Sequence, residues 1–306
     1  MVKKIIKILL NLFIIIVSVV AFCHIPALLY KDIPFSDDFI TFTQYELGFF
    51  PGHFFNKITE TVSQLFNWQN ITYIAEGTTV ERKIFPYIVE SYTYTLTLLF
   101  SALFVSLTLA IMFTILTFYL PNTVQKLLKQ VVIFLEALPD IFVIFAIQLG
   151  VIWIYKHTNI LVAEPFSLNS QKTYLLPIIS LSIVPLIYLY KQSLLMFENE
   201  LGKPYVELGV AKGLNKLYIL IRHILPNILY SFFYNLKYMY LFLLSNMIIL
   251  EFMFNIYGLL KFMTNHPTYE IIATGVLMLT FPLAIIFLTI NALLPKGVVI
   301  YDQKAI

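Results

Sequence analysis

The side chains that could bind a metal ion or carry out acid–base chemistry are few and scattered along the chain. The five histidines never occur four residues apart, the spacing that places two imidazoles on one face of a helix. The single cysteine, Cys23, lies in an apolar run, so no disulfide or cysteine-rich metal site can form within the chain. We therefore expect no catalytic residue, metal site or bound cofactor in this chain.

Two acidic residues, Glu136 and Asp140, interrupt an apolar segment. Acidic side chains inside a membrane are costly and often functional, so one hypothesis is a proton relay or a metal pathway. The alternative, which we favour, is structural. In it, Glu136 lies at the inner interface of the membrane, and Asp140 caps a helix that begins at Pro139.

No GxxxxGK[ST] sequence, the loop that cradles the phosphates of ATP, occurs in the chain. Its ten glycines, including Gly202 next to Lys203, never form one. The chain therefore cannot bind ATP with this device, and it must take energy from a partner, take it from a gradient, or use none.

The composition indicates what kind of protein carries these residues. Of the 306 residues, 59% are apolar and only 12% are charged, and the mean hydropathy is +0.84. A soluble domain has about a quarter of its residues charged, so these values exclude a water-soluble globular fold, and they exclude disorder as well. The net charge of +3 is too small and too scattered for a nucleic-acid partner. A polytopic membrane protein remains.

Six apolar segments are long enough to cross a bilayer, which takes about 20 residues in a helix. They cover residues 8–30, 91–125, 131–155, 173–190, 223–250 and 271–295. The first segment could be a signal peptide, but it is long and lacks a small-residue cleavage site, so we expect a retained helix. With both termini in the cytoplasm, 13 of the 20 Lys and Arg residues fall on the cytoplasmic side, as the positive-inside rule requires.

The predicted fold class is an all-α integral membrane protein with six transmembrane helices, a cytoplasmic loop between spans four and five, and a larger outer loop between spans one and two. Its parts are an N-terminal transmembrane helix (1–30), an extracytoplasmic subdomain (31–90), a five-helix core (91–300) with the cytoplasmic loop at 191–226, and a C-terminal tail (301–306).

The outer segment is rich in Phe and Tyr and should fold against the membrane surface. A helix is predicted over residues 58–68, with its apolar side formed by Ile58, Val62, Leu65 and Phe66. Asn70 begins an Asn-Ile-Thr sequence that fits the glycosylation pattern, which we interpret as chance in a bacterial chain.

The cytoplasmic loop has a helical pattern with its own start and stop signals. Pro204 suits the first turn of a helix, and Gly213 suits its end because glycine accepts the left-handed conformation. Asn215 suits the N-cap of a second helix from Lys216 onward. Two short helices with a tight bend at Gly213 are therefore predicted. Composition alone equally allows an amphipathic hairpin that lies on lipid headgroups.

On the first of these helices, the helical spacing predicts two faces. One face is expected to carry Tyr205, Leu208 and Lys212, and another Glu207, Ala211 and Leu214.

This loop resembles the EAA motif of ATP-binding-cassette (ABC) importer permeases, which reads Glu-Ala-Ala, three residues, Gly, nine residues, Ile-x-Leu-Pro. The matching residues at the right spacing are Glu207, Gly213, Leu225 and Pro226. The departures are Leu208 and Gly209 in place of the two alanines, and His223 in place of the isoleucine.

Further segments, in the right order, resemble the dipeptide/oligopeptide/nickel permease branch of this family. They are Tyr205-Val206, Ala211-Lys212-Gly213-Leu214, Leu220-Ile221-Arg222-His223, Ala137-Leu138-Pro139-Asp140, Glu251-Phe252-Met253-Phe254 with Tyr257-Gly258-Leu259, and Asn291-Ala292-Leu293-Leu294-Pro295. The likeness covers about residues 86–300 well and the outer segment poorly.

The resemblance implies a pore-forming permease subunit of an ATP-driven importer in the bacterial cytoplasmic membrane, with a peptide or a nickel–chelator complex as cargo. The implied partners are a second homologous permease, two ATPase subunits that bind ATP, an extracytoplasmic substrate-binding lipoprotein and membrane lipid. It also implies that the short loop helix couples to the ATPase, with the coupling residues Tyr205, Glu207, Leu208, Ala211, Lys212, Gly213 and Leu214.

Two other classes of function remain open. An ion-driven secondary transporter would be expected to show inverted repeats with broken helices and buried charges near mid-membrane, and neither is clear here. A membrane scaffold without transport is the third hypothesis.

Overall fold

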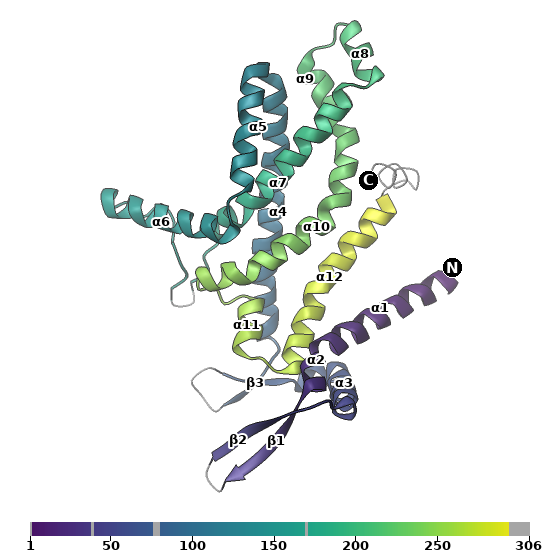
Figure 1. Cartoon of the computed structure of the whole chain (residues 1–306), viewed down its shortest axis with the longest axis vertical. Helices are drawn as coiled ribbons and strands as arrows, with labels where there is room; N and C mark the ends of the chain where they lie inside the picture. The colour runs from purple at the N-terminus through teal and green to yellow at the C-terminus, as the bar shows by residue number, and fades with distance from the viewer. Residues whose placement is uncertain (1, 38–39, 76–79, 169–170, 294–306) are drawn as a thin grey trace. The chain divides into compact units, whose positions relative to one another are not determined.

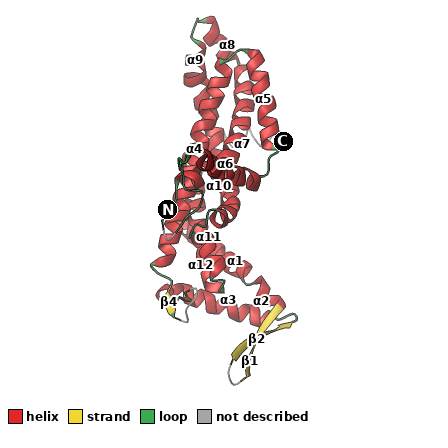
Figure 2. Ribbon diagram, turned by 90° about the vertical axis from the view of Figure 1, so that its left-hand side faces the viewer, coloured by secondary structure: helices red, strands yellow, loops and turns green. Residues whose placement is uncertain are grey.

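In a computed structural model of the chain, helices form most of the fold, with a few short strands (Figure 2). The structure describes residues 2–37, 40–75, 80–168 and 171–293. The chain divides into two compact units, which we describe separately. The first combines the chain up to Tyr92 with Phe262–Pro282, and the second combines Thr93–Lys261 with the chain from Leu283. The predicted tail, 301–306, lies outside the described residues.

The first unit mixes helices with two small antiparallel sheets, so the prediction of a purely α-helical chain was wrong in this region. Its elements are α1 (Val2–Cys23), α2 (Ile25–Leu29), β1 (Tyr30–Asp37), β2 (Ile40–Leu47), α3 (Pro51–Phe66), η1 (Trp68–Asn70), β3 (Thr72–Ile74) and β4 (Glu81–Lys83). β1 pairs with β2, and β3 with β4. The β2 sequence is rich in Ile, Thr, Phe and Tyr, the residue types that favour a pleated strand.

The helix predicted over residues 58–68 is present as α3, which begins seven residues earlier, at Pro51. Proline suits this first helical position because its missing N–H would have no partner there. Three residues of the predicted apolar side, Ile58, Val62 and Leu65, are half-buried. The fourth, Phe66, is the last residue of the helix and is 82% exposed, so its predicted place in the packed side was wrong.

A buried histidine joins three helices of the first unit. His24 Nδ1 lies 2.8 Å from the carbonyl oxygen of Val20, and Nε2 lies 3.0 Å from Thr61 Oγ1 of α3. Its ring stacks on Tyr269 at a centroid distance of 4.5 Å. Tyr269 begins α12 (Tyr269–Leu293). Since both ring nitrogens have partners, this fully buried polar side chain is accommodated without an unmet hydrogen bond.

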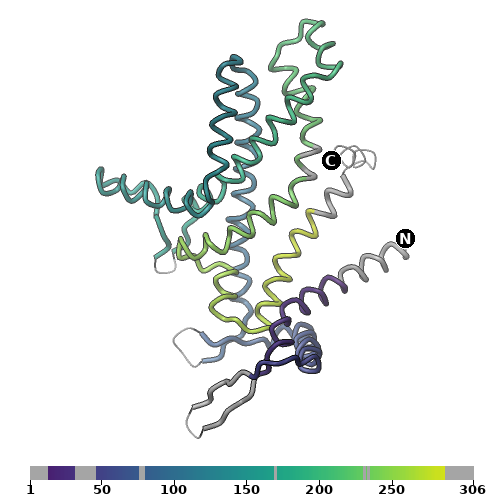
Figure 3. Tube along the Cα trace, in the orientation of Figure 1, coloured from purple at the N-terminus to yellow at the C-terminus, as the bar shows by residue number. Residues whose placement is uncertain are grey.

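The second unit is a bundle of long helices (Figures 1 and 3). Its elements are α4 (Tyr87–Tyr119, from Thr93), α5 (Asn122–Glu136), α6 (Asp140–Thr158), α7 (Leu175–Leu201), α8 (Pro204–Ala211), α9 (Lys216–Tyr218), the π-helix η2 (Ile219–Ile224), α10 (Leu225–Met253) and the start of α11 (Leu259–Asn265). Figure 1 shows α5 running beside α4 and α6 turning sharply away from α5.

Five helices of the described chain are long and apolar enough to cross a membrane. They contain Tyr87–Tyr119, Asp140–Thr158, Leu175–Leu201, Asn235–Met253 and Tyr269–Ile286. The first predicted span corresponds to α1, whose apolar part within the described side chains is the shorter Phe13–Cys23. The six-span topology therefore remains a prediction.

The third predicted segment, residues 131–155, is not one helix. α5 ends at Glu136, and α6 begins at Asp140 after Pro139, whose backbone is extended. Proline removes a backbone donor and restricts the residue before it, so the apolar run is divided there into two helices of different direction.

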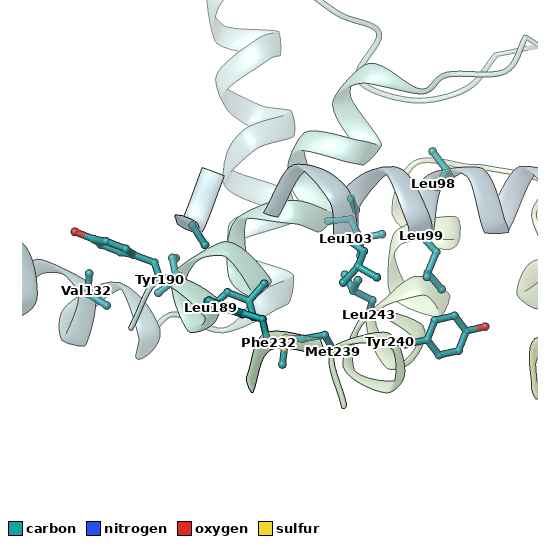
Figure 4. Packing of buried hydrophobic residues seen from close by; sticks show 14 of the residues in the cluster. Leu98, Leu99, Leu103, Val132, Leu189, Tyr190, Phe232, Met239, Tyr240 and Leu243 are labelled. Atoms are coloured by element: carbon teal, nitrogen blue, oxygen red, sulfur yellow. The ribbon is translucent and has the colours of Figure 1, made fainter. Parts of the chain in front are cut away.

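The core of the second unit is made by apolar residues of α4, α5, α7 and α10 (Figure 4). The residues labelled there are Leu98, Leu99, Leu103, Val132, Leu189, Tyr190, Phe232, Met239, Tyr240 and Leu243. Hydroxyl pairs add to this packing, because Thr114 bonds Ser193 and Thr117 bonds Tyr190 between α4 and α7. In a membrane the hydrophobic effect does not favour helix association, because lipid tails are as apolar as the side chains. Side-chain hydrogen bonds of this kind therefore help to hold the helices together.

Candidate functional site

The loop between α7 and α10 folds into a short helix, α8, that ends in a sharp turn. α8 begins at Pro204, after an extended Lys203, as predicted. Its end is a Schellman motif: the Leu214 N–H donates to the Gly209 carbonyl oxygen at 3.2 Å, and the Gly213 N–H donates to that of Val210 at 2.9 Å. Gly213 has φ +72°, which confirms the predicted left-handed turn.

The two sides of α8 differ in exposure. Val206 and Gly209 are buried, and Tyr205 is half-buried. Leu208 and Val210 are 56% and 63% exposed. Exposed as well are five other residues of the predicted coupling set, namely Glu207, Ala211, Lys212, Gly213 and Leu214. The predicted face shared by Tyr205 and Leu208 was therefore wrong, because Tyr205 lies on the inner side and Leu208 on the outer.

Gly209, one departure from the EAA pattern, lies on the buried inner side of α8. A Cβ added there would lie 3.4 Å from Ile219 Cδ1 and 3.8 Å from Leu214 Cδ1. The inner side of α8 would thus accept an alanine methyl group in ordinary van der Waals contact, so this departure from the EAA pattern is a small change. Leu208, the other departure, is exposed, so a large side chain meets no clash within the loop.

Tyr205 attaches α8 to the ends of two long helices. Its hydroxyl donates to Glu200 Oε2 of α7, and Asn227 Nδ2 of α10 donates to the same hydroxyl at 3.2 Å. Burial and the hydrogen bond to the Glu200 carboxylate raise the pKa of Tyr205 to about 12, so the hydroxyl keeps its proton at neutral pH. Glu200 also pairs with Lys203, which precedes α8.

Replacing Tyr205 with phenylalanine should loosen α8. The change removes two hydrogen bonds, one of them to a carboxylate, and each is worth on the order of 1 kcal/mol. We expect hydrogen–deuterium exchange of the α8 amides to rise roughly five- to tenfold at neutral pH. Tyr218→Phe is the matched control, since Tyr218 is 51% exposed in the next segment. Equal exchange in the two variants would contradict an attachment through Tyr205.

Glu207 and Lys212 have no ion-pair partner within the described residues. Both side chains are exposed on the loop. Within the described residues, Glu207 thus forms no ion pair with a neighbouring Arg or Lys. Its carboxylate remains accessible to another molecule.

After the turn, the chain is helical again. Asn215 caps the new helix as predicted, because its side chain accepts the Leu217 N–H at 3.1 Å. The predicted second short helix is not separate, however, because α9 runs through η2 into α10. The wider π turn directly precedes Pro226, whose missing N–H interrupts the regular helical ladder. Asn227 Nδ2 donates to the carbonyl oxygen of His223 at 3.2 Å, one turn before.

Glu136 and Asp140, the two acids that interrupt the apolar segment, lie at the end of α5 and at the start of α6. Glu136 pairs with Lys191, and Lys129 pairs with Glu198, so two ion pairs join α5 to α7. All four side chains are partly exposed, and such pairs contribute little stability. Asp140 occupies the first turn of α6, where a negative charge is favourable, but its side chain makes no cap hydrogen bond, so the predicted cap was wrong.

A buried carboxylate that sequence reasoning left without a role is central to the far end of α10. Glu251 is completely buried. Its Oε1 accepts from Thr95 Oγ1 of α4 at 2.6 Å, and its Oε2 accepts from the Lys261 N–H at 2.7 Å. Thr95 Oγ1 in turn accepts the Leu259 N–H at 2.8 Å. An acid inside an apolar run was the signal that could have identified it.

Gly258 is required by this network. A Cβ added there would lie 2.0 Å from Glu251 Oε1, far closer than real contacts allow. Glu251 and Thr95 satisfy the free N–H groups at the start of α11, which would otherwise be buried without partners. The network therefore joins α4, α10 and α11 within the second unit.

Five apolar helices of spanning length indicate a multi-pass membrane protein, and a short helix with an exposed side is attached to the ends of two of them. The profile of one family, the binding-protein-dependent transport system inner membrane component, matches residues 106–305. The chain belongs to this family of ABC-transporter permeases, and it is a transporter subunit rather than an enzyme. A search of curated proteins finds no significant match.

Proposed function

We propose that this chain is a pore-forming subunit of an ATP-driven importer and that α8 is the helix that docks on the ATPase. The observation that carries the proposal is the two-sided character of α8. Its inner side is fixed by Tyr205, Val206 and Gly209, while Glu207, Leu208 and Val210 are exposed. An exposed apolar pair beside an unpaired carboxylate suits a protein partner with an apolar cleft and a basic or amide rim.

The attachment of α8 supports its use as a coupling element. Tyr205 connects it to α7 and α10, and the Gly213 turn connects it to the continuous helix that begins at Lys216. A force on the exposed side would therefore be transmitted to two long helices. ATP would be bound and hydrolysed by two partner ATPase subunits.

The remaining parts of the proposal concern orientation, cargo and partners. The loop and both termini would be cytoplasmic in a bacterial plasma membrane, as the distribution of Lys and Arg indicates. A second homologous permease would complete the pore, and a substrate-binding lipoprotein would contact residues 31–90. The cargo would be a peptide or a nickel–chelator complex, following the resemblance of the loop and of the Glu251–Leu259 segment.

Crosslinking tests the docking role. In a chain with Cys23→Ser, a cysteine introduced as Leu208→Cys should crosslink to the ATPase in the purified complex. Leu195→Cys, 54% exposed on α7, is the matched control and should not crosslink. In the contrary outcome, a fluorophore attached to the same cysteine is quenched by nitroxide-labelled lipids, while position 208 fails to crosslink in an intact complex. That result would place α8 on the headgroups and show that the docking role is wrong.

A further inference from the structure

A polar cavity of about 360 Å³ lies within the first unit, away from the docking loop in sequence. Five of its polar lining residues come from α3, η1 and β3, namely Ser63, Gln64, Asn67, Asn70 and Thr72. The sixth is Glu270, in the first turn of α12. The volume is at the lower end of the range of small-molecule sites.

The lining of this cavity combines one carboxylate with several amide and hydroxyl groups and has no cation among the described residues. The Gln64 Oε1 atom is buried and has no hydrogen-bond partner. Glu270 forms no ion pair with any residue that the structure describes, and the lining contains no Lys, Arg or His. Asn67 uses its Nδ2 on the carbonyl oxygen of Ser63 at 3.4 Å, which leaves its amide oxygen as an acceptor.

A polar cavity with one carboxylate and no cation in its lining is suited to a cationic donor. A primary ammonium group has three donors and no acceptor, and a hydrogen bond between it and a carboxylate is about twice as strong as a neutral one. A neutral polyol would leave the Glu270 charge uncompensated, and an anion would be repelled by it. Gln64 also lines the cavity, and its amide adds a polar contact beside the carboxylate.

We propose that this cavity, lined by Gln64, Asn67 and Glu270, binds the primary ammonium group of a small organic molecule. The inference goes beyond the docking role of α8 and does not depend on it, because the cavity is formed by the first unit alone. Asn70, noted above only for its glycosylation pattern, would be a lining residue of this site.

Calorimetric titration of the full chain in detergent, without ATPase partners, tests the site. The probe is alanyl-phenylalaninamide with a free amino terminus, and its N-acetylated form is the neutral counterpart. We expect the acetylated form to bind about tenfold more weakly or not at all. n-Butylamine distinguishes the two sources of the ammonium group. Equal affinity for butylamine would assign the site to any small primary amine, and a tenfold weaker affinity would assign it to peptide amino termini; either result upholds ammonium binding.

Three variants locate the binding. Glu270→Gln should lower the affinity for the free-amine probe about tenfold, and Gln64→Leu should lower it severalfold. Glu60→Gln is the control. Glu60 is an exposed acid on α3, the helix that carries Gln64, and it pairs with Lys57. Size-exclusion profiles must match wild type in each case. The proposal is overturned if the acetylated probe binds equally well, if Glu270→Gln and Gln64→Leu both bind like Glu60→Gln, or if wild type shows no binding at about 10 mM probe.

Discussion

Transport by the assembled complex should fall about tenfold or more when Gly213 is replaced by valine, while membrane insertion and abundance stay near normal. Gly213 has φ +72°, and a residue with a Cβ pays about 1–2 kcal/mol there, with a β-branched side chain at the upper end. Relief of this strain would open the Schellman turn and displace α8. Strain of this size shifts a conformational population by roughly 5- to 30-fold. Uptake of substrate and substrate-stimulated ATP hydrolysis are the measurements.

Two controls separate the turn from the change in side-chain size. Gly202→Val places the same side chain just before α8, where the backbone has φ −79° and no atom lies within 4 Å of an added Cβ, so near-normal transport is expected. Gly213→Asn should keep more activity than Gly213→Val, because asparagine tolerates the left-handed region. Normal transport by Gly213→Val would show that the turn is not needed for coupling.

Removal of the Glu251 carboxylate should strongly destabilise the second unit. Glu251→Ala leaves the Thr95 hydroxyl and the Lys261 N–H without their acceptor, and each buried unsatisfied donor costs about 1–3 kcal/mol. We expect the apparent melting temperature in detergent to fall on the order of 5–10 °C. Glu198→Ala, which breaks a partly exposed ion pair, should change it by no more than about 2 °C.

Glycine substitutions test the same network from its other side. Gly258→Ala should be destabilising to a similar extent, because its Cβ would collide with Glu251 Oε1. Gly150→Ala in α6 should be neutral or slightly stabilising, since no atom lies within 4 Å of an added Cβ. If Gly258→Ala melts like Gly150→Ala, the carboxylate is not held where the structure places it.

Sequence reasoning succeeded where the signal is local to the backbone. Pro204, Gly213 and Asn215 each act through their own conformation or through a partner two residues away, so the start, turn and cap of the loop could be predicted. The break after Glu136 was also present in the sequence, as Pro139. A helix start at Pro139 was predicted, but residues 131–155 were still assigned to a single span.

Features that depend on distant segments could not be predicted in this way. The direction of Tyr205 depends on Glu200 and Asn227, which only the fold brings beside it. The role of Glu251 depends on Thr95, 156 residues earlier in the chain. The strand pair β1–β2 falls in the outer segment, where the resemblance to the family is weak and only the residue types indicated strands.

The helix that follows the Gly213 turn is continuous from Lys216 to Met253 through α9, η2 and α10. At about 1.5 Å per residue this run is roughly 55 Å long, nearly twice the hydrocarbon thickness of a bilayer. Sharp bends in helices occur at prolines and π turns, and here both fall between Ile219 and Pro226. Glu251 lies near the far end of this helical run. Because each residue turns an α-helix by about 100°, gain or loss of a single residue in the π turn would rotate that carboxylate away from Thr95.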